Sequence, residues 1–395
     1  MSIFVNILLF LLVISILTFV HELGHFVSAK IIGAKVLEFS LGFGPKLFSK
    51  KWRETIYSFR GLPFGGYVKI LGDGDPGEEM NSKADDKRDL RKKPKWQQIF
   101  VMLSGVTMNI LLAISIYYVV LASNGWELVL NSDFKDFKAI GAEVYLEREG
   151  DVEYEIIEGG KASEAKLPEK GFIKSIDNKE IVYMEEVGEY ISTKKGETIS
   201  INICVDEKCS DYVIEVPEEG KIGISLPSNY LVILSYKEHK LFAGFSHIRN
   251  SLMLIGKKLG EMIGNARLSG DYSELSNSVS GPVGIYFVID YFKKFGVIPF
   301  LGMIADLSVS LALVNVLPIP ALDGGRVLIL LLEWIAGKEL DEKIETKIIN
   351  GSFIFLIILI LFIIIKDIVN IDSMKESQDS LRVEKFRFSL LREPL

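Results

Sequence analysis

An uncharged, apolar run at residues 3–20 leads without a break into the sequence His21-Glu22-Leu23-Gly24-His25. With the turn that follows, this run is long enough to cross roughly 30 Å of hydrocarbon as a helix. A cleaved signal peptide is the alternative, but such a peptide begins with a basic region, and residues 1–4 contain no basic side chain. The sequence therefore predicts a membrane helix that ends near Lys30.

The two histidines stand four residues apart, a spacing that places both on one face of a helix. His21 and His25 can therefore direct their imidazoles at the same metal ion. Glu22 lies beside them, where a carboxylate can take a proton from a metal-bound water. A lone membrane histidine is more often a packing or hydrogen-bonded residue, but the chain has only 4 histidines and two of them form this pattern. The motif thus predicts metal-dependent hydrolysis inside a membrane segment.

Composition limits the other possibilities. Hydrophobic residues make up 49% of the 395 residues and charged residues 25%, and the two kinds are segregated into blocks. A net charge of -7 argues against nucleic acid as a partner. The 2 cysteines, Cys204 and Cys209, are too few for a disulfide scaffold or a cysteine-ligated zinc ribbon. A disulfide across one hairpin tip and two free thiols both remain open.

Three further apolar runs, at 99–122, 297–317 and 353–365 with its flanks, predict three more membrane helices. The segment between the first two helices carries about fifteen Lys or Arg against about nine Asp or Glu, an excess that predicts a cytoplasmic loop. This loop contains turn signals and short β-type runs. Residues 127–240 instead carry about ten more acidic than basic side chains. Alternating runs around a helix-like stretch at 183–194 predict a mostly β domain there, outside the cytoplasm.

The remaining ligand of a metal site must come from elsewhere, since tetrahedral catalytic zinc needs three protein ligands. Asp323 is the candidate, because it follows two prolines that end a helix and precedes two glycines that allow close backbone approach. The predicted topology brings it to the same membrane depth as His21 and His25. A helix cap or a turn is the alternative role for Asp323. Asn315 is open between helix packing and function, and Asp306 is more readily structural.

With these residues in view, the chain resembles the site-2 protease family of intramembrane zinc metalloproteases, and within it the bacterial branch of the regulator of sigma-E protease. Four motifs carry the resemblance: His21-Glu22-x-x-His25, Gly65-Gly66-Tyr67-Val68-Lys69, Pro282-Val283-Gly284 and Asn315-x-x-Pro318-x-Pro320-x-Leu322-Asp323-Gly324-Gly325. The family's second helix usually contains Gly-Pro-x-x-Asn, whereas this chain has Gly105-Val106-Thr107-Met108-Asn109. The missing proline leaves the role of Asn109 open.

The resemblance implies a polytopic α-helical membrane protein with four transmembrane helices, a membrane re-entrant β-element and one extracytoplasmic PDZ-like α+β domain. The implied activity is that of a zinc metalloendopeptidase that cleaves transmembrane segments of single-span proteins, such as anti-sigma factors and signal-peptide remnants, in regulated intramembrane proteolysis. The implied location is the bacterial inner membrane, with the active site near the cytoplasmic side. The implied partners are these substrates and the lipid bilayer.

The resemblance also assigns residue roles. Glu22 is expected to be catalytic, and His21, His25 and Asp323 to bind Zn²⁺. The expected substrate-binding residues are Asn315, Pro318, Pro320, Gly65, Gly66 and Tyr67. A non-catalytic scaffold and a zinc transporter are the rival functions; the first would not need Glu22, and the second would need several ligand sets along a path.

The expected segments follow from these assignments. They are a first transmembrane helix at 1–32, a cytoplasmic loop with the re-entrant β-element at 33–97, a second transmembrane helix at 98–125, the PDZ-like domain at 126–228, surface amphipathic helices with the Pro-Val-Gly loop at 229–296, a third transmembrane helix at 297–325, an interfacial segment at 326–349, a fourth transmembrane helix at 350–370 and a tail at 371–395.

Overall fold

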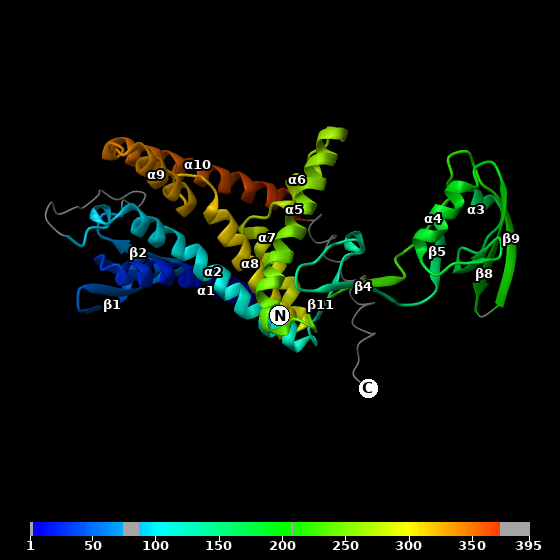
Figure 1. Cartoon of the computed structure of the whole chain (residues 1–395), viewed down its shortest axis with the longest axis horizontal. Helices are drawn as coiled ribbons and strands as arrows, with labels where there is room; N and C mark the ends of the chain where they lie inside the picture. Colours follow the sequence, from blue (N-terminus) through cyan, green and yellow to red (C-terminus); the bar gives the residue numbers. More distant parts are fainter. Residues whose placement is uncertain (1–2, 74–86, 158, 207, 372–395) are drawn as a thin grey trace. The chain divides into compact units, whose positions relative to one another are not determined.

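Four helices in the computed structural model are long and apolar enough to cross a membrane, which confirms the four predicted spans (Figure 1). They are α1 (Ile3–Ile31), α2 (Lys95–Ser123), α8 (Val297–Val316) and α10 (Glu342–Val369). The structure describes residues 3–73, 87–157, 159–206 and 208–371, so the expected tail falls almost entirely outside the described residues. The described chain divides into two compact units, a helical unit (1–123 with 247–395) and a β unit (124–246).

The helical unit is organised by close contact between α1 and α2. A Cβ atom on Gly24 would come within 2.3 Å of the carbonyl oxygen of Ser104, so the two backbones touch at this point. Farther along α1, Val13 and Leu17 form a buried cluster with Met303 and Ile304 of α8 and with α7 (Pro282–Phe292). Glycine at the crossing is therefore what allows the helix that carries the two histidines to approach α2 so closely.

The third span ends earlier than its expected limit of residue 325. Helix α8 stops at Val316, and a short irregular stretch with Pro318 and Pro320 precedes α9 (Asp323–Ala336). Proline lacks the amide donor that continues a helix. Asp323 consequently opens the next helix, where a negative side chain is favoured by the helix dipole. Helix α10 then begins at Glu342, so the expected interfacial segment at 326–349 is divided between two helices.

The expected cytoplasmic loop contains two long strands instead of several short ones. Strand β1 (Val36–Trp52) and strand β2 (Thr55–Ile70) are antiparallel, and both change partners along their length. The first half of β1 pairs with 66–70 on one side and with 56–59 on the other, whereas residues 46–52 pair with 55–60. Gly42, Gly44 and Gly65 have positive φ angles at the places where the pairing changes. The turn signals in the sequence are thus bends within strands.

Helices α5 (Ala243–Ser269), α6 (Ser273–Ser278) and α7 complete the helical unit. Helix α5 lies within residues 229–296, where helices were expected. Pro282, Val283 and Gly284 were expected to form a loop but are the first residues of α7, and this first turn is held by the buried carboxylate of Asp367 on α10. Its Oδ2 accepts hydrogen bonds from the amides of Gly281 at 2.9 Å and Gly284 at 3.0 Å. The end of α10 therefore caps the start of α7.

The β unit contains two antiparallel sheets and two helices. The larger sheet has the order β10-β5-β6-β8-β9, with β7 also paired to β6, and the smaller sheet has the order β3-β11-β4. The strands are β3 (Glu127–Leu130), β4 (Glu143–Arg148), β5 (Val152–Ile156), β6 (Lys170–Ile176), β7 (Lys179–Glu180), β8 (Thr198–Val205), β9 (Lys208–Glu215), β10 (Ile224–Ser225) and β11 (Tyr230–Ser235). A buried cluster that includes Tyr154, Ile173, Ile201 and Ile214 forms its core.

Two sequence expectations can be compared with the β unit. Helix α4 (Met184–Thr193) matches the expected helix at 183–194, whereas α3 (Lys161–Glu164) is a single turn that the periodicity did not indicate. Residues 229–296 were expected to form helices, but Tyr230–Ser235 form the central strand β11. This run is wholly apolar at its centre, as a strand with two neighbours allows. Cys204 and Cys209 stand opposite each other on β8 and β9 and form a disulfide.

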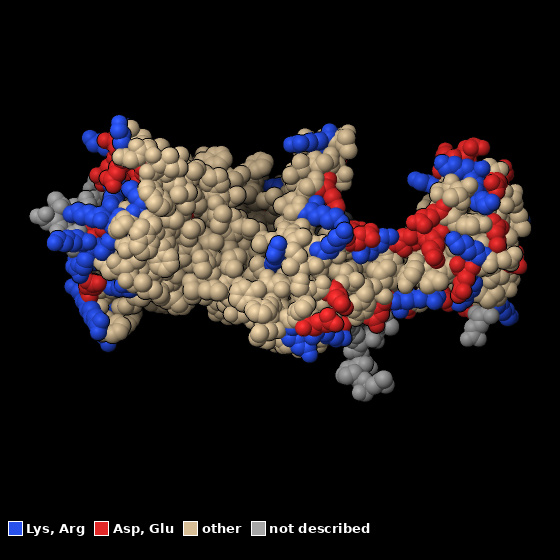
Figure 2. Space-filling view, in the orientation of Figure 1, with Lys and Arg blue, Asp and Glu red and all other residues tan. Residues whose placement is uncertain are grey.

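Charged side chains on the helical unit are unevenly distributed. Figure 2 shows a broad band over the helices that is almost free of charged residues on the face drawn, and a dense group of charges at the end where β1, β2 and α9 lie. In the most apolar 18 residues of each of the four spans, only 6% to 39% of the residues are buried inside the protein. Helices that expose this much apolar surface require a non-aqueous environment, which supports a membrane protein.

Candidate metal centre

Three potential ligand atoms converge where α1 meets the start of α9. The Nε2 atoms of His21 and His25 lie 3.2 Å apart, and Oδ2 of Asp323 lies 3.2 Å from the first and 3.4 Å from the second. The histidines are each 8% exposed. This is the one group of three or more His, Cys, Asp or Glu residues in the described chain whose arrangement could hold a metal ion.

The triangle has the size of one face of a zinc tetrahedron. Zinc lies roughly 2.0–2.1 Å from imidazole nitrogen and carboxylate oxygen, so two ligand atoms of a tetrahedron lie roughly 3.4 Å apart. The three observed separations are 3.2, 3.2 and 3.4 Å. Oδ2 of Asp323 is moreover a buried oxygen with no hydrogen-bond partner among the described residues. These residues fit a metal ion with three protein ligands and one position left for water or substrate.

A backbone carbonyl on α2 orients the second histidine. Nδ1 of His25 lies 2.8 Å from the carbonyl oxygen of Val101, and a carbonyl can only accept a hydrogen bond. The ring must therefore carry its proton on Nδ1, which leaves the lone pair of Nε2 directed at the other ligand atoms. Metal-binding histidines are typically fixed in this way by a partner on the opposite ring nitrogen.

Asn109 on α2, whose role the sequence left open, contacts His21. Its Nδ2 lies 3.3 Å from Nδ1 of His21, and its side chain is fully buried. Oδ1 of this amide has no hydrogen-bond partner among the described residues. Rotating the amide by 180° would place Oδ1 against Nδ1, where it could accept the ring proton and free Nε2 for metal. Asn109 is therefore placed to orient His21. The sequence signal for this role was the spacing of Gly105 and Asn109, which matches the Gly and Asn of the family's second-helix motif.

Gly105 is a second α2 residue whose role becomes visible only in the structure. A Cβ atom at this position would lie 2.4 Å from Nε2 of His25 and 2.8 Å from Nε2 of His21. No side chain larger than hydrogen fits between α2 and the imidazoles. The sequence indicated only that this glycine allows close helix contact.

Glu22 lies beside the end of strand β2. Its Cγ would be 3.8 Å from a Cβ atom on Gly66, so the carboxylate-bearing side chain borders this part of the strand. Residues 66–70 pair with β1 on one side, and within the described chain no strand pairs with their other side. Gly65 has a φ of 78°, and a Cβ there would meet the ring of Phe43 at 2.4 Å. Gly65 and Gly66 thus allow the edge of 66–70 that faces away from β1 to lie close to the Glu22 side chain.

Side chains on the neighbouring strand segments brace this edge. Arg60 donates to Glu38 at 3.0 Å and to the hydroxyl of Tyr67 at 2.5 Å, and its Nε donates to Ser40 at 3.1 Å. Burial by itself raises the pKa of Glu38, but hydrogen bonds from Ser58, Arg60 and Lys46 outweigh it and lower that pKa to about 2. Burial, together with the Glu38 carboxylate, raises the pKa of Tyr67 to about 12.

The other sequence-predicted residues lie around the same junction. Asn315 is half-buried near the end of α8 and forms no side-chain hydrogen bond to another described residue. Pro318 is exposed and Pro320 half-buried in the stretch between α8 and α9. Asp306 is not part of the triangle; its Oδ1 accepts a hydrogen bond from Tyr117 at 2.5 Å. His247 packs against the same tyrosine, with ring centroids 4.5 Å apart.

Comparison with known proteins matches this chain to one family over most of its length. The model of peptidase family M50 matches residues 9–359. A zinc metalloprotease from Fusobacterium nucleatum is 32% identical over 364 residues, which cover 91% of this chain and 98% of that protein. The zinc metalloprotease RasP from Bacillus licheniformis is 27% identical, with 92% of this chain and 98% of that protein covered. The chloroplast membrane metalloprotease ARASP from Arabidopsis thaliana is 28% identical, with 92% and 79% covered.

The family match spans α1, both strands of the β1–β2 sheet, the β unit and the start of α9, so it includes every residue of the candidate metal centre. The Fusobacterium and Bacillus relatives are named as zinc metalloproteases, in agreement with a triangle of two imidazoles and a carboxylate of the size that zinc requires. The chain therefore belongs to peptidase family M50, the site-2 proteases, and is a membrane zinc metalloprotease.

Proposed function

We propose that this protease hydrolyses peptide bonds inside the membrane, within transmembrane segments of single-span proteins. The observation that carries the proposal is the location of the ligand triangle. Two of its members belong to α1, one of the four apolar helices, and the third opens the helix that directly follows α8. A soluble protease would have no need to assemble its metal ligands from helices of this kind.

In this proposal His21, His25 and Asp323 hold the zinc ion, and Glu22 is the general base. Zinc when bound lowers the pKa of water and polarises the scissile carbonyl. Glu22 accepts a proton at its carboxylate and can later deliver it to the leaving amine. Val101 and Asn109 keep the ring protons of the histidines on Nδ1. Gly105 keeps the space between α2 and the imidazoles free.

The substrate segment must be extended before it can react, because a helix hides its carbonyls in internal hydrogen bonds. We propose that it pairs, as an added strand, with the edge of 66–70 that faces away from β1. That edge lies beside Glu22, so a strand bound there would present its carbonyls to the site. Gly65, Gly66 and Tyr67 would contact the substrate backbone. Asn315 would offer a replacement hydrogen bond, with Pro318 and Pro320 shaping the opposite side.

We propose that the active site lies near the cytoplasmic side of a bacterial inner membrane. The positive excess between α1 and α2 supports this orientation. With four spans, the β unit then lies outside the cytoplasm, and its disulfide suits an oxidising compartment. We assign the β unit as the PDZ-like module and the β1–β2 sheet as the re-entrant element. Exposed Leu47, Phe48 and Trp52 on the outer segment of that sheet support its contact with lipid.

We propose as substrates the class that the family resemblance implies: proteins with one transmembrane segment whose outer part has already been trimmed, such as anti-sigma factors and signal-peptide remnants. The decisive experiment reconstitutes the purified protein in lipid vesicles with a fluorescent single-span substrate. Wild-type protein should cleave it, and cleavage should stop on chelation and resume with zinc. Glu22→Gln should retain zinc and lose cleavage by a factor of about a hundred or more.

Three outcomes of this experiment would contradict the proposal. Cleavage by Glu22→Gln at the wild-type rate would remove the general base. Cleavage of a soluble peptide but not of the membrane substrate would place the reaction outside the membrane. Zinc movement across the vesicle without cleavage would favour a transporter. The single ligand group in the described chain already counts against a transport path, which needs successive sites.

A further inference from the structure

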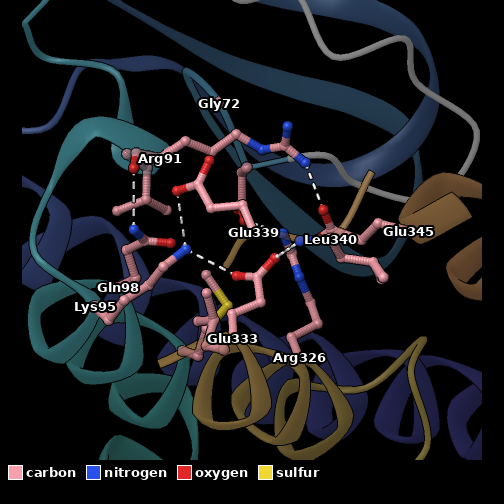
Figure 3. A pocket seen from close by; sticks show the side chains of 13 residues that line it. Gly72, Arg91, Lys95, Gln98, Arg326, Glu333, Glu339, Leu340 and Glu345 are labelled. Atoms are coloured by element: carbon pink, nitrogen blue, oxygen red, sulfur yellow. Dashed lines mark hydrogen bonds and ion pairs between the residues drawn. The ribbon is translucent and has the colours of Figure 1, made fainter. Parts of the chain in front are cut away.

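A group of ion pairs fills the junction between α2, α9 and the start of α10 (Figure 3). The side chains surround a cavity of about 40 Å³, which has room for water but not for a substrate. Three elements of the helical unit and the end of β2 meet there. Figure 3 shows that the charged groups point toward one another across this space, with Arg326 and Glu333 rising from the same helix.

Several ion pairs link the elements, among them three that each connect a different pair of segments. Lys95 on α2 lies 2.8 Å from Glu333 on α9, and Arg91 lies 2.5 Å from Glu345 on α10. The third pair joins Arg326 on α9 to Asp73, just after β2. The side chains of this third pair are 14% and 8% exposed.

Burial of this degree means that the Arg326–Asp73 pair is not explained by stability. Removing two charges from water costs about as much free energy as their attraction returns, and apolar residues of similar size often serve stability equally well. What this pair supplies is a fixed charge contact, between Nη2 of Arg326 and Oδ1 of Asp73, which holds α9 against the segment that follows β2. The pair therefore acts as an orientation device for the helix that carries Arg326.

That helix also carries the third candidate ligand. Asp323 and Arg326 are three residues apart in the first turns of α9, so they lie on neighbouring positions of one face and rotate together about the helix axis. A rotation of α9 that released Arg326 from Asp73 would also carry Asp323 away from the two imidazoles. Contacts of Gly324 and Gly325 with the backbone at Val316 and Ile319 set how close α9 comes, but glycine has no side chain with which to fix rotation.

The anchor on the other side is rigid. A Cβ on Gly72 would overlap Oδ1 of Asp89 at 1.8 Å, so the chain beside Asp73 lies directly on that buried carboxylate. The amide of Leu90 donates to the carbonyl oxygen of Leu71 at 2.9 Å, and Asp89 caps the turn that follows. Asp73 thus projects from a segment that is tied to the start of α2, which itself packs against α1.

We propose that the Arg326–Asp73 pair is a positioning pair that sets the rotation of α9 and thereby presents Asp323 to the metal. The inference rests on the proposed ligand set of His21, His25 and Asp323. Neither Arg326 nor Asp73 touches the metal or the substrate in this scheme. Their effect is on the arrangement of the third ligand, so it is expressed first in zinc affinity and only through it in cleavage.

The test replaces the pair by apolar residues of similar size, in the double variant Arg326→Met/Asp73→Leu. Zinc affinity is measured on the full-length protein in detergent by competition with a chromophoric chelator, and unfolding temperature is measured without metal. We expect the zinc dissociation constant to rise about tenfold or more, with the metal-free unfolding temperature unchanged. The single variant Arg326→Lys, which keeps a positive charge opposite Asp73, should retain most of the wild-type affinity.

The control is Arg88→Met/Glu54→Leu, which removes an ion pair of 2.5 Å between the segment that precedes α2 and the turn that joins β1 to β2. It should leave zinc affinity at the wild-type value. Wild-type affinity in Arg326→Met/Asp73→Leu would overturn the proposal, as would an equal loss in the control. Should the double variant fail to fold, Asp73→Asn keeps the side-chain shape and removes the charge; wild-type zinc affinity in that variant would likewise reject the positioning role.

Failure of the ligand set itself is recognised separately. Asp323→Asn is measured in the same competition assay, and it should weaken zinc binding more than the loss of the positioning pair does. If Asp323→Asn binds zinc as the wild type does, the proposed ligand set is wrong. If Asp323→Asn loses zinc while Arg326→Met/Asp73→Leu does not, the ligand set stands and the positioning pair is rejected.

Discussion

Gly105 on α2 lies directly against His25 on α1, so closely that a methyl group on its Cα would come within 2.4 Å of the imidazole Nε2. The same methyl group would lie 2.6 Å from Cε1 of His21. Both histidines are thus pressed against a backbone that has no side chain at this point. The packing of α2 against α1 at Gly105 therefore limits the positions that the two imidazoles can take.

Gly105→Ala should therefore weaken zinc binding. Overpacking of this kind costs roughly 1–3 kcal/mol, and if the imidazoles yield, this is roughly a ten- to hundredfold loss of zinc affinity. The measurement is chelator competition on the purified protein. Gly302→Ala on α8 is the matched control, because nothing lies within 4 Å of its added Cβ. Equal zinc affinity in both variants would show that α2 moves aside without cost.

Asn109→Leu should also lower zinc affinity, through loss of the contact with Nδ1 of His21. Removing such a partner typically costs ten- to a hundredfold in metal affinity. The control is Thr107→Val, whose hydroxyl bonds only its own helix at the carbonyl of Leu103. Nitrogen NMR of labelled histidine adds a direct readout, because the variant should lose the preference of His21 for a protonated Nδ1. An unchanged tautomer and affinity would contradict the assignment.

Glu38→Gln should change how stability depends on pH. The pKa of Glu38 is held at about 2, below its ordinary value of 4.5, because Ser58, Arg60 and Lys46 bond to the carboxylate. The ionised form therefore contributes stability fully above about pH 4.5, and this contribution is lost as the pH falls toward 2.

The check is thermal unfolding of wild type and Glu38→Gln between pH 2.5 and about 6, with chelator present so that zinc loss does not contribute. The difference in unfolding temperature between the two proteins should be largest near pH 6 and shrink on acidification. A difference that stays constant over this range would show that folding does not lower the pKa of Glu38.

Reduction of Cys204–Cys209 should destabilise the β8–β9 hairpin. The disulfide joins directly paired residues whose Cα atoms are 4.0 Å apart and closes a short loop. Closing a loop of this size stabilises by about 2 kcal/mol in the chain-entropy model. Hydrogen exchange of the β8 and β9 amides should quicken accordingly in Cys204→Ser/Cys209→Ser. Wild-type protein treated with reductant is the control and should exchange at the same rate as the variant.

The strand pairing within the β1–β2 sheet could not be predicted from the sequence. Its glycines were visible as turn signals, and the run at 55–59 was visible as a strand. That these belong to two long strands, each of which changes partners at a glycine, depends on pairing between residues far apart in the chain. Local propensity contains no information on such pairing.

The amino-acid sequence alone predicted the four apolar spans, because each run is long enough and low enough in charge to cross a bilayer as a helix. It also indicated His21 and His25, since helical spacing places both on one face with Glu22 beside them, and it singled out Asp323 through topology. The contacts of Gly105, Val101 and Asn109 with the imidazoles, and the pairing of Arg326 with Asp73, became visible in the tertiary structure. Those relationships depend on which backbones come into contact, and contact between distant helices is set by side-chain packing over the whole unit and not by any one segment.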